Sequence, residues 1–131
     1  MKTSQNNDLE FLHVYLISDF KHHQVEPITM QVEKVLQGGV RALQLREKDL
    51  SPKELLAQAL EIKPLIKKYD AKLFINDRAD IAEIAGADGV IIETHETPEL
   101  AFSDGQQTLN HVGASLLFEQ LKQVKVLAET M

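Results

Sequence analysis

Short apolar runs alternate with longer amphipathic stretches along the whole of this chain. Runs of this length suit buried strands, and the stretches between them have the spacing of surface helices. We expect strands at 13–18, 40–46, 72–76, 89–92 and 112–115. Such alternation predicts an α/β fold of about five βα units, with parallel strands joined by right-handed crossovers. Periodicity alone does not distinguish two architectures for these units, an open doubly wound sheet and part of a barrel.

The helix that follows the second expected strand has the clearest start. Ser51 can cap it, Pro52 suits the first helical position, and Glu54 can complete a capping box. Pro64 is predicted to kink or interrupt this helix, because proline lacks an N–H group and crowds the preceding turn. Further helices are expected over 28–36, 78–85 and 116–128, and a weak one within 97–108.

Composition excludes several classes of function. The formal net charge is −6 and no stretch gathers Lys and Arg, so nucleic acid and anionic membranes are not expected partners. The chain has no cysteine, which excludes disulfides, thiolate metal sites and thiol nucleophiles. The polar first ten residues and the lack of a membrane-spanning apolar run predict a soluble, cytoplasmic protein. A length of 131 residues predicts one domain, 1–131.

Polar residues share one face of the second expected strand. Gln44 and Arg46 alternate with leucines there, whereas a buried parallel strand is normally apolar on both faces. Arg46 can bind a phosphate through its two-pronged guanidinium group, and Lys48 just beyond can add a mobile charge. Alternatively, 46–49 form a solvated loop with local ion pairs. A solvated loop at 46–49 does not explain why Gln44, within the expected strand, is polar.

Further polar residues follow the later expected strands. Ligands gather at the carboxyl ends of strands in α/β folds, so Asn76 and Asp77 are well placed. Asp77 can bind magnesium, or it can cap the following helix. Glu96 can approach the same metal, or it can be a solvated carboxylate. Ser115 ends the fifth expected strand, where its hydroxyl can reach an anion.

The remaining candidate chemistry is weaker. None of the five histidines has the spacing of a recognised metal site, and His22 and His23 are expected in an exposed loop. Neither a phosphate-binding P-loop nor a dinucleotide glycine fingerprint is present.

Four segments together resemble the thiamine-phosphate synthase family and its thiazole tautomerase relatives. The stretches are 15–19 (YLISD), 38–51 (GGVRALQLREKDLS), 74–82 (FINDRADIA) and 86–90 (GADGV). The second and third are the most specific. The resemblance extends over about residues 12–115. It implies a triosephosphate-isomerase-type (β/α) barrel, of which this chain would be a part.

Members of that family join a hydroxymethyl-pyrimidine diphosphate to a thiazole phosphate and release pyrophosphate. The resemblance assigns the pyrimidine diphosphate to Gln44, Arg46, Lys48 and Asn76, the pyrophosphate group to Ser115, and magnesium (Mg2+) to Asp77. After the fourth strand the family usually has His-Leu-Gly-Gln-Glu-Asp, whose last residue helps to hold the metal. This chain reads IIETHE over 91–96, which leaves Glu96 as the candidate replacement.

The resemblance also predicts what the chain lacks. A complete barrel normally needs about 250 residues, so we expect a C-terminally truncated chain without the last strands and their thiazole-phosphate pocket. The alternatives are therefore an active synthase and an inactive homologue or binding module that binds the pyrimidine diphosphate at most. A tautomerase is less favoured, because Leu117 replaces that branch's histidine. Unpaired strand edges predict a homo-oligomer or a complementing chain.

Overall fold

The computed structural model describes residues 9–100 and 108–130 of the 131-residue chain, the last seven of them by their backbone alone. Two compact units divide the chain, one ending at Ile91 and the other beginning at Ile92. The expectation of a single domain over 1–131 stays a prediction. Within the described ranges, no helix has the length and apolar character needed to cross a membrane.

A parallel four-stranded sheet organises the first unit. Its strands are β1 (Tyr15–Ile17), β2 (Ala42–Leu45), β3 (Lys72–Asn76) and β4 (Gly89–Ile91), and their order in the sheet is their order in the sequence. Every neighbouring pair is parallel. The predicted α/β class with parallel strands is therefore confirmed, and the carboxyl ends of all four strands lie at one edge of the sheet.

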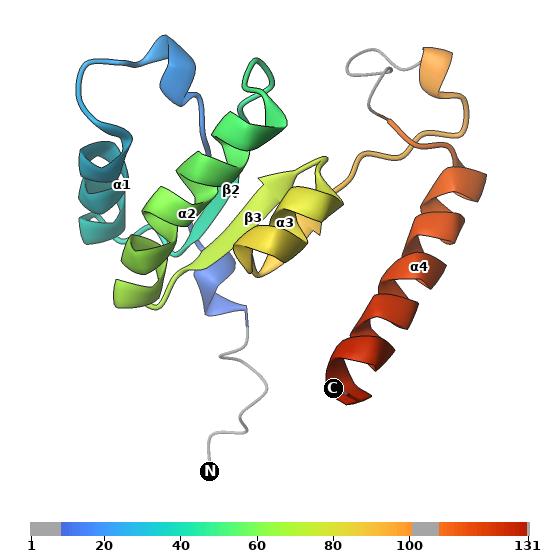
Figure 1. Ribbon diagram of the computed structural model, residues 1–131. Helices are drawn as coiled ribbons and strands as arrows, with labels where there is room; N and C mark the ends of the chain where they lie inside the picture. Colours follow the sequence, from blue (N-terminus) through green and yellow to red (C-terminus); the bar gives the residue numbers. More distant parts are fainter. Residues whose placement is uncertain (1–8, 101–107, 131) are drawn as a thin grey trace. The chain divides into compact units, whose positions relative to one another are not determined.

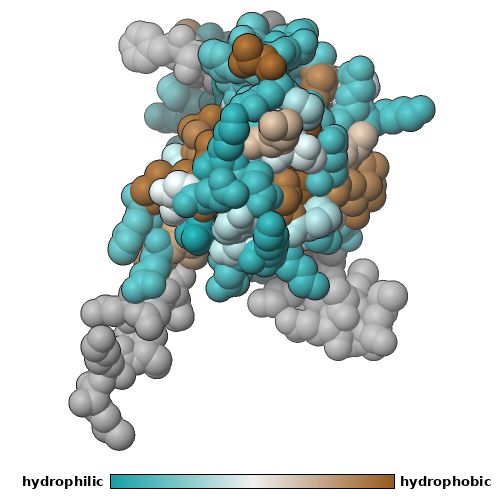
Figure 2. Space-filling model, turned by 90° about the vertical axis from the view of Figure 1, so that its left-hand side faces the viewer, coloured by the Kyte–Doolittle hydropathy of each residue, from teal (hydrophilic) through white to brown (hydrophobic). Residues whose placement is uncertain are grey.

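Three helices cover one face of this sheet (Figure 1): α1 (Ile28–Gln37), α2 (Pro52–Lys68) and α3 (Ala79–Ala85). Alternate residues of the strands point toward them and form the core, which includes Leu43, Leu45, Leu73 and Ile75. These four side chains are 0–1% exposed. Figure 2 shows mostly hydrophilic side chains on the side of the molecule where α1 lies. The core therefore lies between the sheet and its helices.

The start of α2 confirms the predicted capping box. Ser51 Oγ accepts a hydrogen bond from the Glu54 N–H at 3.2 Å, and the Glu54 carboxylate accepts one from the Ser51 N–H at 2.8 Å. The predicted interruption at Pro64 is wrong, because α2 continues to Lys68. Pro64 lies on the solvent side of the helix, where water can bind the carbonyl group that proline leaves without a donor.

The second unit contains no strand of the sheet among its described residues. It has a short 3₁₀ turn, η4 (Pro98–Leu100), and a long helix, α4 (His111–Thr130), with an isolated parallel bridge between Thr94 and Leu109. The fifth strand expected at 112–115 is wrong, since these residues form the start of α4. A helix satisfies its backbone hydrogen bonds within one segment, whereas a strand needs a partner. The terminal helix expected at 116–128 is confirmed, and the rest of 97–108 lies largely outside the described residues.

Candidate functional site

Two buried amides lie on the face of the sheet opposite the helices, near the carboxyl ends of the strands. Gln44 is 5% exposed and Asn76 is 8% exposed. Gln44 Nε2 donates to the Tyr15 hydroxyl at 2.9 Å, and Asn76 Nδ2 donates to Gln44 Oε1 at 3.0 Å. Buried polar groups are normally paired in this way. The hydrogen bonds therefore join β1, β2 and β3 and fix the orientation of both amides.

An aromatic cluster lies on the same face, toward the other end of the strands. The Phe74 ring stacks on Phe11 at 6.2 Å between centroids and lies tilted against Tyr15 at 6.1 Å. A Cβ atom on Gly89 would lie 2.9 Å from the Phe74 ring. Phe74 thus needs a glycine on the neighbouring strand, and its ring supports the tyrosine that binds Gln44.

Hydrogen bonds tie together the loops that follow β1 and β2. Ser18 Oγ donates to Glu47 Oε2 at 2.9 Å and accepts from the Arg46 N–H at 2.9 Å. The other oxygen, Glu47 Oε1, accepts from the Lys21 N–H at 3.0 Å. Glu47 is only 8% exposed. The interpretation of 46–49 as a solvated loop is therefore wrong for Glu47, although Lys48 and Asp49 are exposed.

A hollow of about 200 Å³ lies beside these two loops, and we call it the strand-end hollow. It is lined by Asp19, Lys21, His22, Arg46, Glu47, Lys48 and Asp49. Arg46 is half-buried there and Lys48 is exposed. Basic side chains outnumber acidic ones in the lining when His22 is protonated, and guanidinium and ammonium groups are the usual ligands of phosphate.

His22 belongs to this hollow because of its pairing with Asp19. His22 Nδ1 lies 2.5 Å from Asp19 Oδ1. This hydrogen bond raises the pKa of the His22 imidazole above its ordinary value and lowers the pKa of the Asp19 carboxyl group. The predicted exposure of His22 and His23 is confirmed. The sequence did not indicate that His22 lines the hollow.

Asp77 directly follows β3 in an unusual backbone conformation. Its φ of 66° lies in the left-handed region, which aspartate tolerates better than most residues. Its N–H donates to the Ile91 carbonyl at 2.8 Å, which fixes it to the end of β4. The N-cap residue of α3 is Arg78, so Asp77 lies one residue before the cap position. Strained residues of this kind concentrate at functional sites.

Arg78, the residue after Asp77, is engaged in a two-pronged ion pair. Its guanidinium group binds Asp80 at 2.9 and 2.6 Å. The hydrogen bonds from Arg78 lower the pKa of Asp80 to about 2 and raise the pKa of Arg78. Arg78 is therefore held on α3.

The carboxylates that the structure describes do not form a closed metal cage. Within residues 9–100 and 108–123, no three Asp, Glu or His side chains gather as metal ligands. Magnesium does not need such a cage, because it commonly keeps several waters and binds one or two carboxylates together with substrate phosphates. Asp77 fits that role as a single carboxylate at the strand ends.

The other two predicted residues lie in the second unit. Glu96 is exposed between β4 and η4, and Ser115 is exposed on α4. Ser115 therefore does not end a strand, which was the reason for expecting it near an anion. The first unit by itself brings the remaining predicted residues to its strand ends: Gln44, Arg46, Lys48, Asn76 and Asp77.

Besides His22 and its neighbours in the strand-end hollow, the residues of the site that were not predicted include Tyr15, Ser18 and Glu47. A signal for them existed in the alternation of the strands. Tyr15 falls on the same face as Gln44 once β1 and β2 are paired, since Tyr15 lies opposite Ala42 in the register. Ser18 and Glu47 are polar residues just beyond two neighbouring strands. Their pairing requires the strand register, which the sequence did not supply.

Comparison with known proteins identifies the family of this chain. Residues 14–125 match the family model described as thiamine monophosphate synthase. A thiamine-phosphate synthase of Clostridium botulinum is 35% identical over 114 residues, which are 86% of this chain and 54% of that protein. One of Fusobacterium nucleatum is 36% identical over 91 residues, 70% of this chain and 44% of that protein.

A solved structure is also similar to this chain. The thiamine phosphate pyrophosphorylase from Pyrococcus furiosus aligns with a TM-score of 0.55 and 34% identity, over 61% of this chain and 38% of that one. The four parallel strands thus correspond to part of a TIM-type barrel. The chain spans about half the length of the curated relatives described above. Since the family model matches most of its residues, the chain belongs to the thiamine monophosphate synthase family.

Proposed function

We propose that this chain binds a pyrimidine diphosphate at the carboxyl ends of its strands and acts in thiamine-phosphate synthesis. The observation that carries the proposal is the chain of hydrogen bonds from Tyr15 through Gln44 to Asn76, of which Gln44 and Asn76 are buried. These hydrogen bonds hold two amides on one face of the sheet. Arg46, two residues after Gln44 on β2, lines the strand-end hollow. Membership of the family and the names of the similar proteins support the same function.

Each residue has a distinct role in this proposal. Gln44 and Asn76 orient the heterocycle through their amides, which the hydrogen bonds hold in place before the ligand arrives. Arg46 and Lys48 hold the diphosphate. Asp77 holds a magnesium ion that the diphosphate also binds.

The reaction proposed is substitution at the methylene carbon of the pyrimidine. The bond between that carbon and the diphosphate oxygen breaks, and its electron pair leaves with pyrophosphate. The lone pair of the thiazole nitrogen then forms the new C–N bond. Arg46 and Lys48 neutralise the negative charge that develops on the leaving group. Bound magnesium supplies further charge neutralisation there.

The location of binding is tested by nuclear magnetic resonance on the full chain. Adding hydroxymethyl-pyrimidine diphosphate with magnesium is expected to shift the backbone amides of 44–48 and 76–77. Gln44→Leu removes the hydrogen bonds that join Gln44 to Tyr15 and to Asn76, and it is expected to abolish the shifts at 76–77. Shifts confined to other regions of a folded protein would overturn the proposed site.

A second candidate is a binding module without activity of its own. It is favoured by the chain's coverage of only 44% and 54% of the two synthases compared above. A synthase assay on the chain alone distinguishes the candidates. Turnover supports the enzyme, whereas magnesium-dependent binding without turnover supports the module.

Assembly with a second copy or a complementing chain is part of the proposal. The sheet face opposite the helices leaves Ile17 51% exposed and Tyr15 36% exposed. Exposed apolar groups next to strand edges favour association. Sedimentation velocity is expected to show a dimer or larger species, and a monomer at micromolar concentration would contradict it.

The absence of cysteine supports a cytoplasmic setting.

A further inference from the structure

His22 lines the strand-end hollow together with Arg46 and Lys48, the two residues proposed to hold the diphosphate. It ends the 3₁₀ turn η3 (Phe20–His22), which follows β1, whereas Arg46 and Lys48 follow β2. Its side chain is 66% exposed, so a ligand in the hollow can reach the imidazole. The loop after β1 thus brings a basic side chain to the same hollow as the loop after β2.

Hydrogen bonds fix the turn that carries His22 to the loop after β2. The Lys21 N–H, within the turn, donates to Glu47 Oε1 at 3.0 Å, and the Ser18 hydroxyl just before the turn donates to Glu47 Oε2 at 2.9 Å. Ser18 is 5% exposed and Glu47 is 8% exposed, and breaking hydrogen bonds between buried groups is costly. His22 is therefore held beside the hollow before a ligand arrives.

Asp19 orients the imidazole ring of His22. His22 Nδ1 lies 2.5 Å from Asp19 Oδ1. Both ring nitrogens donate in the charged form of histidine, so Asp19 uses the Nδ1–H group and the Nε2–H group is left for a ligand. The same hydrogen bond raises the pKa of His22 above 6.5. The ring therefore keeps its charge to a higher pH than an ordinary histidine does.

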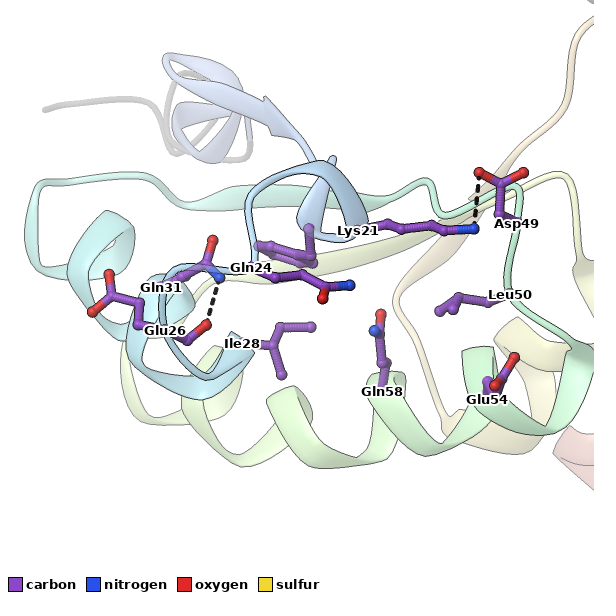
Figure 3. A pocket seen from close by; sticks show the side chains of 10 residues that line it. Lys21, Gln24, Glu26, Ile28, Gln31, Asp49, Leu50, Glu54 and Gln58 are labelled. Carbon is purple, nitrogen blue, oxygen red and sulfur yellow. Dashed lines mark hydrogen bonds and ion pairs between the residues drawn. The ribbon is translucent and has the colours of Figure 1, made fainter.

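The charge on His22 decides the net charge of the hollow. The charged and titratable groups near this ring come from two loops: Asp19, Lys21 and His23 after β1, and Arg46, Glu47, Lys48 and Asp49 after β2. Lys21 and Asp49 pair with each other at 3.4 Å (Figure 3). Besides His22, three basic and three acidic side chains line the hollow, so the lining becomes positive only when His22 is protonated. Protonation of His22 therefore favours an anion there.

We propose that His22 is a further ligand of the diphosphate, which it binds through its Nε2–H group in the imidazolium form. His22 holds the diphosphate from the loop after β1, while Arg46 and Lys48 hold it from the loop after β2. Affinity is then highest where the ring is charged and falls as the ring loses its proton. The inference rests on the proposed function, because it concerns the same diphosphate.

Calorimetric titration of the full chain with hydroxymethyl-pyrimidine diphosphate and magnesium tests the proposal, at about pH 6.5 and at about pH 9. His22→Gln keeps a polar side chain that cannot become charged. At the lower pH it should bind about three- to tenfold more weakly than the wild type, because a charge-assisted hydrogen bond is lost from an exposed position. At the higher pH the two proteins should bind equally. Comparing them at each pH cancels the titration of the ligand itself.

His23→Gln is the matched control. His23 adjoins His22 and lies 3.9 Å from Asp19, but it does not line the hollow. This variant should bind as the wild type does at both pH values. Asp19→Asn should move the fall in affinity to lower pH, because an amide accepts the hydrogen bond from Nδ1 without stabilising the charged ring as a carboxylate does.

The outcomes separate this inference from the proposed function. A His22→Gln variant that binds as the wild type does at both pH values would overturn the role of His22 and leave the proposed diphosphate site standing. An equal loss of affinity in His23→Gln would overturn that role too. Absence of binding by folded wild-type protein at either pH would overturn both.

Discussion

Buried between two loops, the Glu47 carboxylate has a structural role that its charge would not suggest. It accepts hydrogen bonds from the Ser18 hydroxyl and the Lys21 N–H, while Ser18 in turn accepts from the Arg46 N–H. The backbone that carries Arg46 is therefore fixed by its neighbours. At the scale of single residues, the strand-end hollow is positioned largely by side chains that need not touch a ligand.

Glu47→Ala is expected to destabilise the protein by about 1–3 kcal/mol, because it leaves the Ser18 hydroxyl and the Lys21 N–H without their acceptor. Chemical denaturation monitored by circular dichroism measures the change. The control is Asp49→Ala, which breaks only the exposed pair with Lys21 at 3.4 Å and should cost less than about 1 kcal/mol. Equal losses in the two variants would contradict the role given to Glu47.

The pair of Asp19 and His22 makes a pH-dependent contribution. The raised pKa of His22 means that its share of stability is complete below the ordinary value of 6.5 and is lost as the pH rises through the higher folded value. The lowered pKa of Asp19 means that its share is present above 3.8 and is lost as the pH falls. The pairing is therefore strongest between these two values.

Titration of the His22 imidazole by nuclear magnetic resonance checks this pairing. We expect a pKa above 6.5 that returns toward the ordinary value in Asp19→Asn. Asp49→Asn should lower it less, because Asp49 acts on His22 only through its charge and more weakly than Asp19 does. An unchanged pKa in Asp19→Asn would show that the hydrogen bond is not its cause.

At the scale of elements, the close contact between β3 and β4 depends on a glycine. A Cβ atom at Gly89 would lie 2.9 Å from the ring of Phe74, whereas one at Gly38 would make only ordinary contacts from 3.4 Å. The ring lies against Tyr15, which accepts the hydrogen bond of Gln44. The packing of Phe74 against Gly89 therefore also supports Tyr15, which belongs to the candidate site.

Gly89→Ala is expected to cost about 1–3 kcal/mol through this overpacking. Gly38→Ala is the matched control, because Gly38 has a φ of −74° that alanine adopts easily. Thermal unfolding followed by circular dichroism measures both. A Gly89→Ala variant as stable as the Gly38→Ala variant would show that the Phe74 ring moves aside without cost.

The elements of the first unit could be predicted from sequence because local signals agreed there. Apolar runs marked β1 to β4, and the capping box marked the start of α2. The fifth strand failed for a physical reason: residues 112–115 are apolar enough for a strand, but a strand also needs a neighbour, which periodicity does not report. In the site, alternation predicted the sheet face on which Gln44 lies, and the end of the third apolar run predicted that Asn76 lies at a strand end. Hydrogen bonds between strands, such as that of Tyr15, require a register that the sequence left undetermined.

At the scale of the whole molecule, the first unit carries part of a barrel with one face packed and one partly exposed. The helices cover the core face, while Ile17 on the other face is 51% exposed. In a closed barrel the latter face is the packed interior. Five predicted ligand residues already lie at the strand ends of this unit. The account therefore predicts that binding of the pyrimidine diphosphate survives in this chain, whether or not turnover does.

Calorimetric titration of the full chain with hydroxymethyl-pyrimidine diphosphate tests this claim most directly. The account predicts binding that requires magnesium and that falls at least about tenfold in Arg46→Ala and in Asp77→Ala, since each removes a charge-assisted contact. Lys53→Ala, an exposed substitution on α2 outside the strand-end hollow, should bind as the wild type does. Absence of binding by protein shown to be folded, or binding that neither Arg46→Ala nor Asp77→Ala weakens, would contradict it.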